Sequence, residues 1–162
     1  MKFGALLSGE GKDYFYIMHL SYDGEERERL WNYAKENNII GLSHKYVEDD
    51  WTKVRKKAKN QVGKGWVRQF DSFCRLEKGD IVMVLNGMDS LLGVAIATEP
   101  KHRYDENLND AFFDHMRRVE WKIKYEFSRR KNLPKLLEGF SHTLSKVTKK
   151  SPRWHMLVNL DL

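Results

Sequence analysis

The sequence predicts an α+β domain in which helices flank a curved β-sheet or a small barrel. Three consecutive strands expected between residues 78 and 127 carry this prediction. The first two are the short apolar runs Ile81–Leu85 and Leu91–Thr98, which are typical of buried strands because turn-forming residues bound each run. Asn86-Gly87 lies between them and favours the positive φ angles of a tight hairpin turn.

The third strand is predicted by strict alternation. From Val119 to Phe127 every second residue is apolar, and each residue between two apolar ones is charged. This period of two indicates a strand with one face in a core and the other in water. Extended towards the N-terminus, the same period places His115 and Arg117 on one face, with Glu120 pointing away.

Two segments have the apolar spacing of helices that bury one face. The first is Glu25–Asn37. Its expected buried stripe consists of Leu30, Trp31 and Ala34. The second helix is Trp51–Val62, which resumes as Trp66–Cys74 after an interruption at Gly63-Lys64-Gly65. We expect the aromatic face of the second helix to pack on the sheet.

The remaining elements are short. Tyr14–Leu20, Ile39–Leu42 and Trp154–Leu160 are predicted as strands because they are bulky, apolar and bounded by polar residues. Pro134 is well placed in the first turn of a short helix. A further short element is expected within residues 141–147.

Length and composition fit one domain. The chain has 162 residues, of which 1–12 are glycine-rich and expected to be flexible, and 13–162 form the single predicted domain. No apolar run approaches membrane-spanning length. The lone Cys74 fits a reducing cytoplasm, and the six histidines lack a metal-ligand spacing, so neither a metal nor a cofactor is expected.

The sequence also lacks motifs of known catalytic sites. Gly9-Glu10-Gly11-Lys12 lacks the spacing of a phosphate-binding loop, and the serine-hydrolase and zinc-protease motifs are absent from the sequence. We therefore expect a binding module and not an enzyme.

Basic residues cluster in two places in a chain of net charge +6. The first cluster contains Lys53, Arg55, Lys56 and Lys57, and the second contains Lys146, Lys149, Lys150 and Arg153. Such clusters bind phosphates by releasing counterions, although charge alone is also consistent with a solvated helix face. An aromatic content of 12% favours nucleic acid, because exposed bases stack on aromatic rings.

A series of short motifs resembles the EVE domains, PUA-like modules related to the YTH readers of N6-methyladenine. The motifs are Phe15–His19, Leu30-Trp31, Ile39-Ile40-Gly41, Phe70, Lys78–Val82, Asn86-Gly87, Leu92-Gly93-Val94, Arg118–Trp121 and Ser151–Trp154. Their order and spacing extend over residues 14–158. The series is most similar to the N-terminal modules of archaeal McrB-type restriction GTPases.

The resemblance implies a PUA-like curved sheet that binds methylated DNA. A flipped base would enter an aromatic cage, with N6-methyladenine favoured and methylcytosine as the alternative. The AAA+ GTPase and the nuclease would reside on other domains or subunits, and we expect the present chain to be a fragment of such a protein.

The resemblance also implies a set of pocket residues. Leu42-Ser43 occupies the place of a cage tryptophan and serine in YTH readers, so Tyr46 is a candidate for the missing wall. The loop after the third strand supplies Tyr104, our first choice, and Phe112. Groups that read the base edge are expected directly after the first strand. These groups are His19, Ser21, Tyr22 and Asp23.

Three alternatives remain. The chain could be an RNA-binding PUA-like module, or an assembly domain whose basic face binds a protein. It could also be a small ASCH-like enzyme acting on nucleotides or RNA, in which His115 or Asp105 would be essential.

Overall fold

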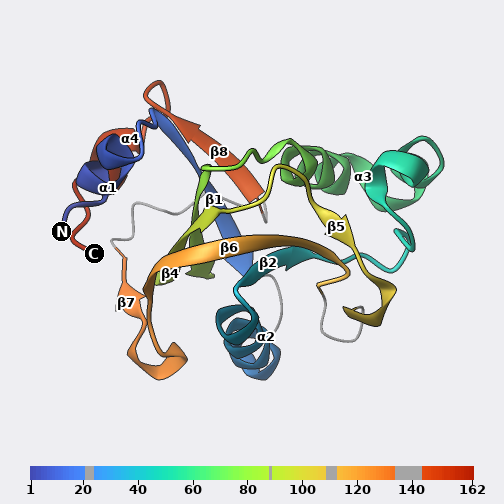
Figure 1. Ribbon diagram of the computed structural model, residues 1–162, viewed down its shortest axis with the longest axis horizontal. Coiled ribbons are helices and arrows are strands. Elements are labelled where there is room, and N and C mark those ends of the chain that lie inside the picture. Colours follow the sequence, from blue (N-terminus) through green and yellow to red (C-terminus); the bar gives the residue numbers. More distant parts are fainter. Residues whose placement is uncertain (21–23, 88, 109–112, 134–143) are drawn as a thin grey trace.

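The computed structural model describes residues 1–20, 24–87, 89–108, 113–133 and 144–162. These residues form an α+β fold in which a strongly curled, half-barrel sheet is flanked by helices (Figure 1). The strands are β1 (Tyr14–Leu20), β2 (Ile39–Leu42), β3 (Ile81–Asn86), β4 (Ser90–Ala97), β5 (Arg103–Tyr104), β6 (His115–Lys124), β7 (Lys131–Asn132) and β8 (Leu144–Thr148). The helices are α1 (Phe3–Gly9), α2 (Gly24–Asn37), α3 (Trp51–Arg75) and α4 (Trp154–Val158), with 3-10 turns at Glu106–Leu108 and Phe127–Arg129.

The strands follow the order β2-β6-β4-β3-β1-β8, with β5 beside β6 and β7 beside β4. The predicted hairpin of β3 and β4 is confirmed, and Gly87 at its turn has a φ of 61°. β1 pairs in parallel with β3, which requires the long connection through α2, β2 and α3. β1 and β2 have the predicted bounds.

The predicted alternation along β6 is confirmed, since Val119 is buried and Glu120 and Lys122 are exposed. β6 nevertheless begins earlier than the alternation, at His115. His115 and Arg117 do share a face, and both are completely buried. Arg117 donates hydrogen bonds from its two terminal nitrogens to the backbone carbonyls of Glu99, Cys74 and Leu76, which stabilise the buried charge, while its Nε has no partner among the described residues.

Helix α3 crosses the open side of the curled sheet and contacts β8 (Figure 1). Asp50 is the N-cap of α3, and its carboxylate accepts a hydrogen bond from the backbone N–H of Thr52 at 2.9 Å. Its predicted interruption is confirmed as a kink at Gly63, which has φ 79° and ψ 162°. Phe70 and Phe73 are fully buried in the cluster between α3 and the sheet, as expected.

Both ends of the chain differ from expectation. Residues 1–12 were expected to be flexible, but Phe3 is completely buried and its ring lies 4.7 Å from that of Phe15. Trp154–Leu160 was predicted as a strand, whereas Trp154–Val158 is the helix α4, which packs against α1. The cause is long-range pairing of the two termini, in which the N–H of Phe3 donates to the carbonyl of Leu160. A prediction from a local window of sequence cannot include this partner, because it lies at the opposite end of the chain.

The helix expected at Pro134 and part of the element expected within 141–147 lie outside the described residues, although β8 overlaps the latter. Within the part of the chain that the structure describes, no helix has the length and apolar composition needed to cross a membrane.

Candidate nucleic-acid interface

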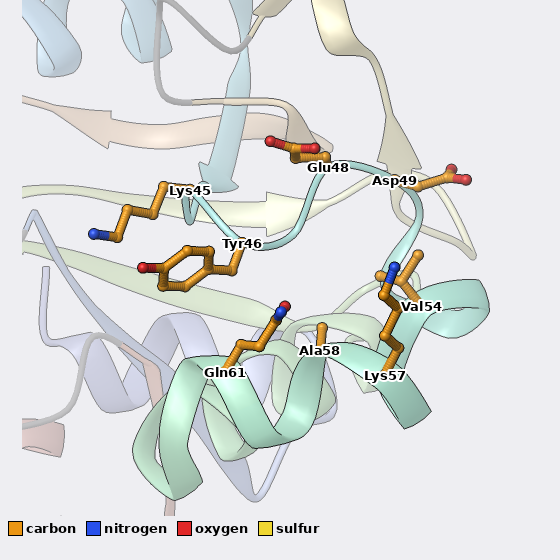
Figure 2. Close-up of a pocket in the computed structure, with 8 residues that line it drawn as sticks. All are labelled: Lys45, Tyr46, Glu48, Asp49, Val54, Lys57, Ala58 and Gln61. Carbon is orange, nitrogen blue, oxygen red and sulfur yellow. The ribbon is translucent and has the colours of Figure 1, made fainter.

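A pocket of about 340 Å³ lies between the segment that follows β2 and the first half of α3 (Figure 2). It is lined by Lys45, Tyr46, Glu48, Asp49, Val54, Lys57, Ala58 and Gln61. Figure 2 shows the side chains of Lys57, Ala58 and Gln61 rising from α3 towards the loop that carries Tyr46. We call this hollow the Tyr46 pocket.

Burial on either side of Tyr46 fixes the loop. Leu42 and Ser43, at the end of β2, are only 3% and 8% exposed, and Val47 is completely buried. Tyr46 itself is 47% exposed, and its backbone N–H donates to Nδ1 of His44 at 3.2 Å. The loop therefore presents a single large aromatic ring to solvent at a defined position.

Cations and other rings surround this tyrosine. The ammonium of Lys45 lies 4.8 Å from the centre of the Tyr46 ring, a cation–π arrangement. The ring of His44 lies 5.7 Å from that of Tyr46 and 4.8 Å from that of Trp66 on α3. This combination of exposed ring and adjacent cation suits a base with its phosphate.

His115 supports the pocket from the core side. Its ring lies 4.9 Å from the rings of both Phe70 and Tyr104. Its Nε2 atom lies 3.0 Å from the carbonyl oxygen of Asp49, and its Nδ1 atom lies 3.3 Å from a carboxylate oxygen of Asp114. Since the ring is completely buried and both nitrogens face oxygens, His115 positions the loop and has no surface with which to touch a substrate.

Tyr104 is connected to the same region indirectly, because its ring packs against that of His115. Burial raises the pKa of the Tyr104 hydroxyl, and the nearby carboxylates of Asp114 and Glu106 raise it further. The hydroxyl therefore remains a hydrogen-bond donor at neutral pH. Tyr104 does not line the Tyr46 pocket directly.

His19 lies elsewhere, beside the hairpin of β3 and β4. It is 8% exposed, and its Nδ1 atom lies 2.6 Å from the carbonyl oxygen of Gly87. Burial lowers the pKa of His19 despite this hydrogen bond, and the charge of Arg27 lowers it further, so the ring is neutral at pH 7. Nε2 of His19, Nε of Arg27 and Oδ1 of Asn86 are buried and have no hydrogen-bond partner among the described residues.

The predicted pocket residues thus separate into two groups. Tyr46 lines the pocket, Leu42 and Ser43 form the buried end of the strand that leads to it, and Tyr104 lies behind it. His19 belongs to the hairpin region. Ser21, Tyr22, Asp23 and Phe112 lie outside the described residues.

The first basic cluster lies on the first half of α3. Lys53, Arg55, Lys56 and Lys57 are all exposed there. Lys57 lines the Tyr46 pocket, whereas Lys53 lies 3.8 Å from the carboxylate of Asp49. Arg55 makes two hydrogen bonds, of 2.8 and 2.9 Å, to the carboxylate of Asp71. A phosphate would have to compete with Asp71 for Arg55, so Lys56 and Lys57 are the better phosphate contacts.

The second basic cluster lies on and after β8. Lys146, Lys149 and Lys150 are exposed, and Arg153 is half-buried at the start of α4. The ammonium of Lys146 lies 3.8 Å from the centre of the Tyr14 ring. Trp154, which follows this cluster, is 9% exposed and packs in the core beside Phe15.

Sequence reasoning did not select Lys45 or Gln61 for the pocket. Lys45 could have been found as the cation next to Tyr46, and Gln61 as the residue one helical turn after Lys57. Among the described residues, no group of three or more His, Cys, Asp or Glu side chains is arranged to hold a metal ion.

Residues 18–148 match the family described as "Domain of unknown function (DUF8426)". This match covers more than half of the chain. The chain belongs to this family. No curated protein matches the sequence. The matched residues begin within β1 and end with β8, so they include the Tyr46 pocket and the basic cluster of α3 but neither α1 nor α4.

Proposed function

We propose that this protein reads a modified base in DNA. One observation carries the proposal: the exposed ring of Tyr46 lies in a pocket that cations flank on two sides, Lys45 from the loop and Lys57 from α3. An aromatic face binds a base, and the cations bind the phosphates next to it.

The dimensions and energies suit a flipped base. The pocket volume of about 340 Å³ lies within the roughly 300–1,000 Å³ typical of small-ligand sites. Extruding a base from a duplex costs a few kcal/mol. Stacking on an aromatic ring contributes about 1–3 kcal/mol per base, and phosphate contacts contribute further.

Selectivity for a methylated base follows from the same chemistry. A methyl group on the exocyclic amine adds apolar surface that Val54 and Ala58 can cover, and the amine keeps one donor. Gln61, whose side chain points towards Tyr46, supplies an acceptor for that donor (Figure 2). N6-methyladenine is the preferred ligand in this proposal, and a methylated cytosine is the alternative.

The proposal includes the wider assignment implied by the motif series. The curled sheet with flanking helices supports a PUA-like, EVE/YTH-type fold. In that case the chain acts in the cytoplasm as the targeting module of a McrBC-like restriction system. The GTPase and nuclease activities then belong to other domains or subunits.

A fluorescence-anisotropy titration at fixed salt tests the proposal. Matched duplexes carry adenine, N6-methyladenine, cytosine or 5-methylcytosine at one position, and a structured RNA of equal length serves as the fifth ligand. We expect one modified duplex to bind most tightly. Equal affinity for all four duplexes, or a marked preference for the RNA, would overturn modified-base reading.

Two substitutions at one position locate the base. Tyr46→Ala removes the stacking face and should abolish the preference between modified and unmodified duplexes. Tyr46→Phe keeps the face and should retain the preference. If Tyr46→Ala keeps the preference and Tyr104→Ala abolishes it, the base binds beside Tyr104 instead.

A further inference from the structure

A second hollow, of about 750 Å³, lies at the other end of α3. Its walls come from β1, the end of α3, the turn after β4, and β8. The residues that matter for its chemistry are Tyr14, Tyr16, Ser72, Arg75, Lys101 and Lys146. It shares no lining residue with the Tyr46 pocket, and we call it the Tyr16 pocket.

Three cations from three separate elements line the Tyr16 pocket. Arg75 ends α3, Lys101 follows β4, and Lys146 lies in β8. All three are exposed, and none forms an ion pair with a described carboxylate. Cations that converge on a hollow without a carboxylate partner favour an anionic ligand.

The carboxylates at this site do not cancel that charge. Asp80 is 1% exposed and already bound on both oxygens. It accepts hydrogen bonds from the Tyr14 hydroxyl at 2.6 Å and from the Lys12 ammonium at 2.9 Å, and its second oxygen accepts from the backbone N–H of Glu77 at 2.9 Å. The carboxylate of Glu77 is exposed at the rim, which leaves the lining net positive.

The Tyr16 hydroxyl adds a neutral hydrogen-bond donor to the charged groups of this pocket. Tyr16 is only 5% exposed, yet its hydroxyl makes no hydrogen bond with a described residue. Burial raises the pKa of this hydroxyl to about 12, aided by the charge of Asp80, so it stays protonated. An acceptor atom of a ligand in the pocket can therefore take a hydrogen bond from this hydroxyl.

Lys146 is held in place before any ligand arrives. Its ammonium lies 3.8 Å from the centre of the Tyr14 ring and 5.9 Å from that of Tyr16. Tyr14 cannot turn away, because its hydroxyl is bonded to Asp80. The cation therefore loses little freedom on binding, which is the advantage of a preorganised site.

We propose that the Tyr16 pocket is a second binding site, which takes a phosphate group of a nucleotide. Phosphate oxygens accept hydrogen bonds from the Tyr16 hydroxyl and Ser72 and pair with Arg75, Lys101 and Lys146. The hollow exceeds the size of a phosphate, and the exposed Pro100 at its wall leaves room for the attached sugar or base. The phosphate could belong to a free nucleotide or to a nucleic-acid strand, and the inference does not depend on modified-base reading.

NMR titrations of the full chain test this site. The probes are deoxyadenosine 5′-monophosphate, deoxyadenosine, and a thymidine hexanucleotide without terminal phosphates. We expect the monophosphate to bind at least about tenfold more tightly than deoxyadenosine, since a charge-assisted hydrogen bond contributes about that factor. Arg75→Gln and Tyr16→Phe should each weaken the monophosphate about tenfold.

A matched control separates the pocket from general charge. Lys124→Gln makes the same charge change on the exposed face of β6 and should leave the affinity unchanged. Equal affinity for the monophosphate and deoxyadenosine would overturn the proposal, as would equal losses in Arg75→Gln and Lys124→Gln. Unchanged binding in both Arg75→Gln and Tyr16→Phe would do the same.

The source of the phosphate follows from the third probe. A strand is the ligand if the hexanucleotide binds more tightly than the monophosphate and depends on Arg75 and Tyr16. A free nucleotide is the ligand if the hexanucleotide binds more weakly. Tyr46→Ala should leave monophosphate binding at the Tyr16 pocket intact, so failure of one site can be distinguished from failure of the other.

Discussion

The Nε2 atom of His115 lies 3.0 Å from the backbone carbonyl oxygen of Asp49. This contact joins a fully buried residue of β6 to the loop that forms one wall of the Tyr46 pocket. It helps to explain how the loop that exposes Tyr46 keeps a fixed position relative to α3. The pocket is therefore coupled to the stability of the core beneath it.

Removing this contact should destabilise the protein. His115→Ala deletes a buried ring, its packing against Phe70 and its hydrogen bond to Asp49. We expect the free energy of unfolding to fall by about 3 kcal/mol, measured by urea denaturation. His155→Ala, on the exposed side of α4, should change it by less than about 0.5 kcal/mol. Similar stabilities for the two variants would contradict a structural role for His115.

Asp80 should make the stability depend on pH in acid. Burial raises the pKa of Asp80, but hydrogen bonds from Glu77, Tyr14 and Lys12 outweigh it, so the pKa lies below its usual 3.8. The stabilisation is complete above pH 3.8 and is lost as the pH falls through the lowered pKa. Asp80→Asn should therefore lower the free energy of unfolding by about 2 kcal/mol at pH 7 and by progressively less below pH 3.8.

Urea midpoints of the wild type and of Asp80→Asn, measured from pH 7 down to pH 2, give the difference in stability at each pH. Asp161→Asn removes an exposed carboxylate that pairs with Lys2 and serves as the control, with a much smaller effect at pH 7. A difference between wild type and Asp80→Asn that stays constant down to pH 2 would refute the linkage.

Two neighbouring glycines of α3 should respond in opposite ways to alanine. Neither Cβ would meet a heavy atom within 4 Å, so only the backbone differs. Gly63 has φ 79° and ψ 162°, a region nearly restricted to glycine, and Gly63→Ala should cost about 1–3 kcal/mol of unfolding free energy. Gly65 is helical, and Gly65→Ala should raise the free energy of unfolding by about 0.5–1 kcal/mol. Thermal denaturation shows whether each variant is stabilised or destabilised. If both stabilities change in the same direction, the backbone kink at Gly63 does not determine the response to alanine.

Salt dependence should identify the phosphate contacts on α3. Each phosphate contact contributes about −0.9 to the slope of log affinity against log salt concentration. Lys57→Gln should therefore make the slope for duplex DNA shallower by about 1, and Lys124→Gln should leave it unchanged. Anisotropy titrations at several salt concentrations give both slopes. An unchanged slope for Lys57→Gln would remove this residue from the interface.

Local pattern was sufficient to predict most of the elements. Alternation along Val119–Lys124, the turn at Asn86-Gly87 and the break at Gly63 each depend on neighbouring residues, so they appear in the sequence itself. The basic face of α3 was predictable for the same reason. Helical spacing in the first half of α3 places its lysines away from the buried Ala58 and Val62.

The secondary structure of the termini and the burial of polar side chains in the core depend on tertiary contacts. α1 and α4 form because residues at opposite ends of the chain pack together, and a short apolar run such as Trp154–Val158 fits a strand or a helix equally well in isolation. Arg117 looks like a surface charge in the sequence. Folding brings the carbonyls of Cys74, Leu76 and Glu99 to its guanidinium, and their hydrogen bonds make its burial possible.

The same limit applies to the two pockets. The sequence pattern indicates that Lys57 and Lys146 belong to basic clusters of a small α+β domain, and the family resemblance alone suggests Tyr46 as a pocket residue. It did not determine that Tyr16, from β1, would face Arg75 at the end of α3. A pocket is formed by residues that are distant in the chain, and their proximity depends on strand pairing and helix packing, which no local pattern encodes.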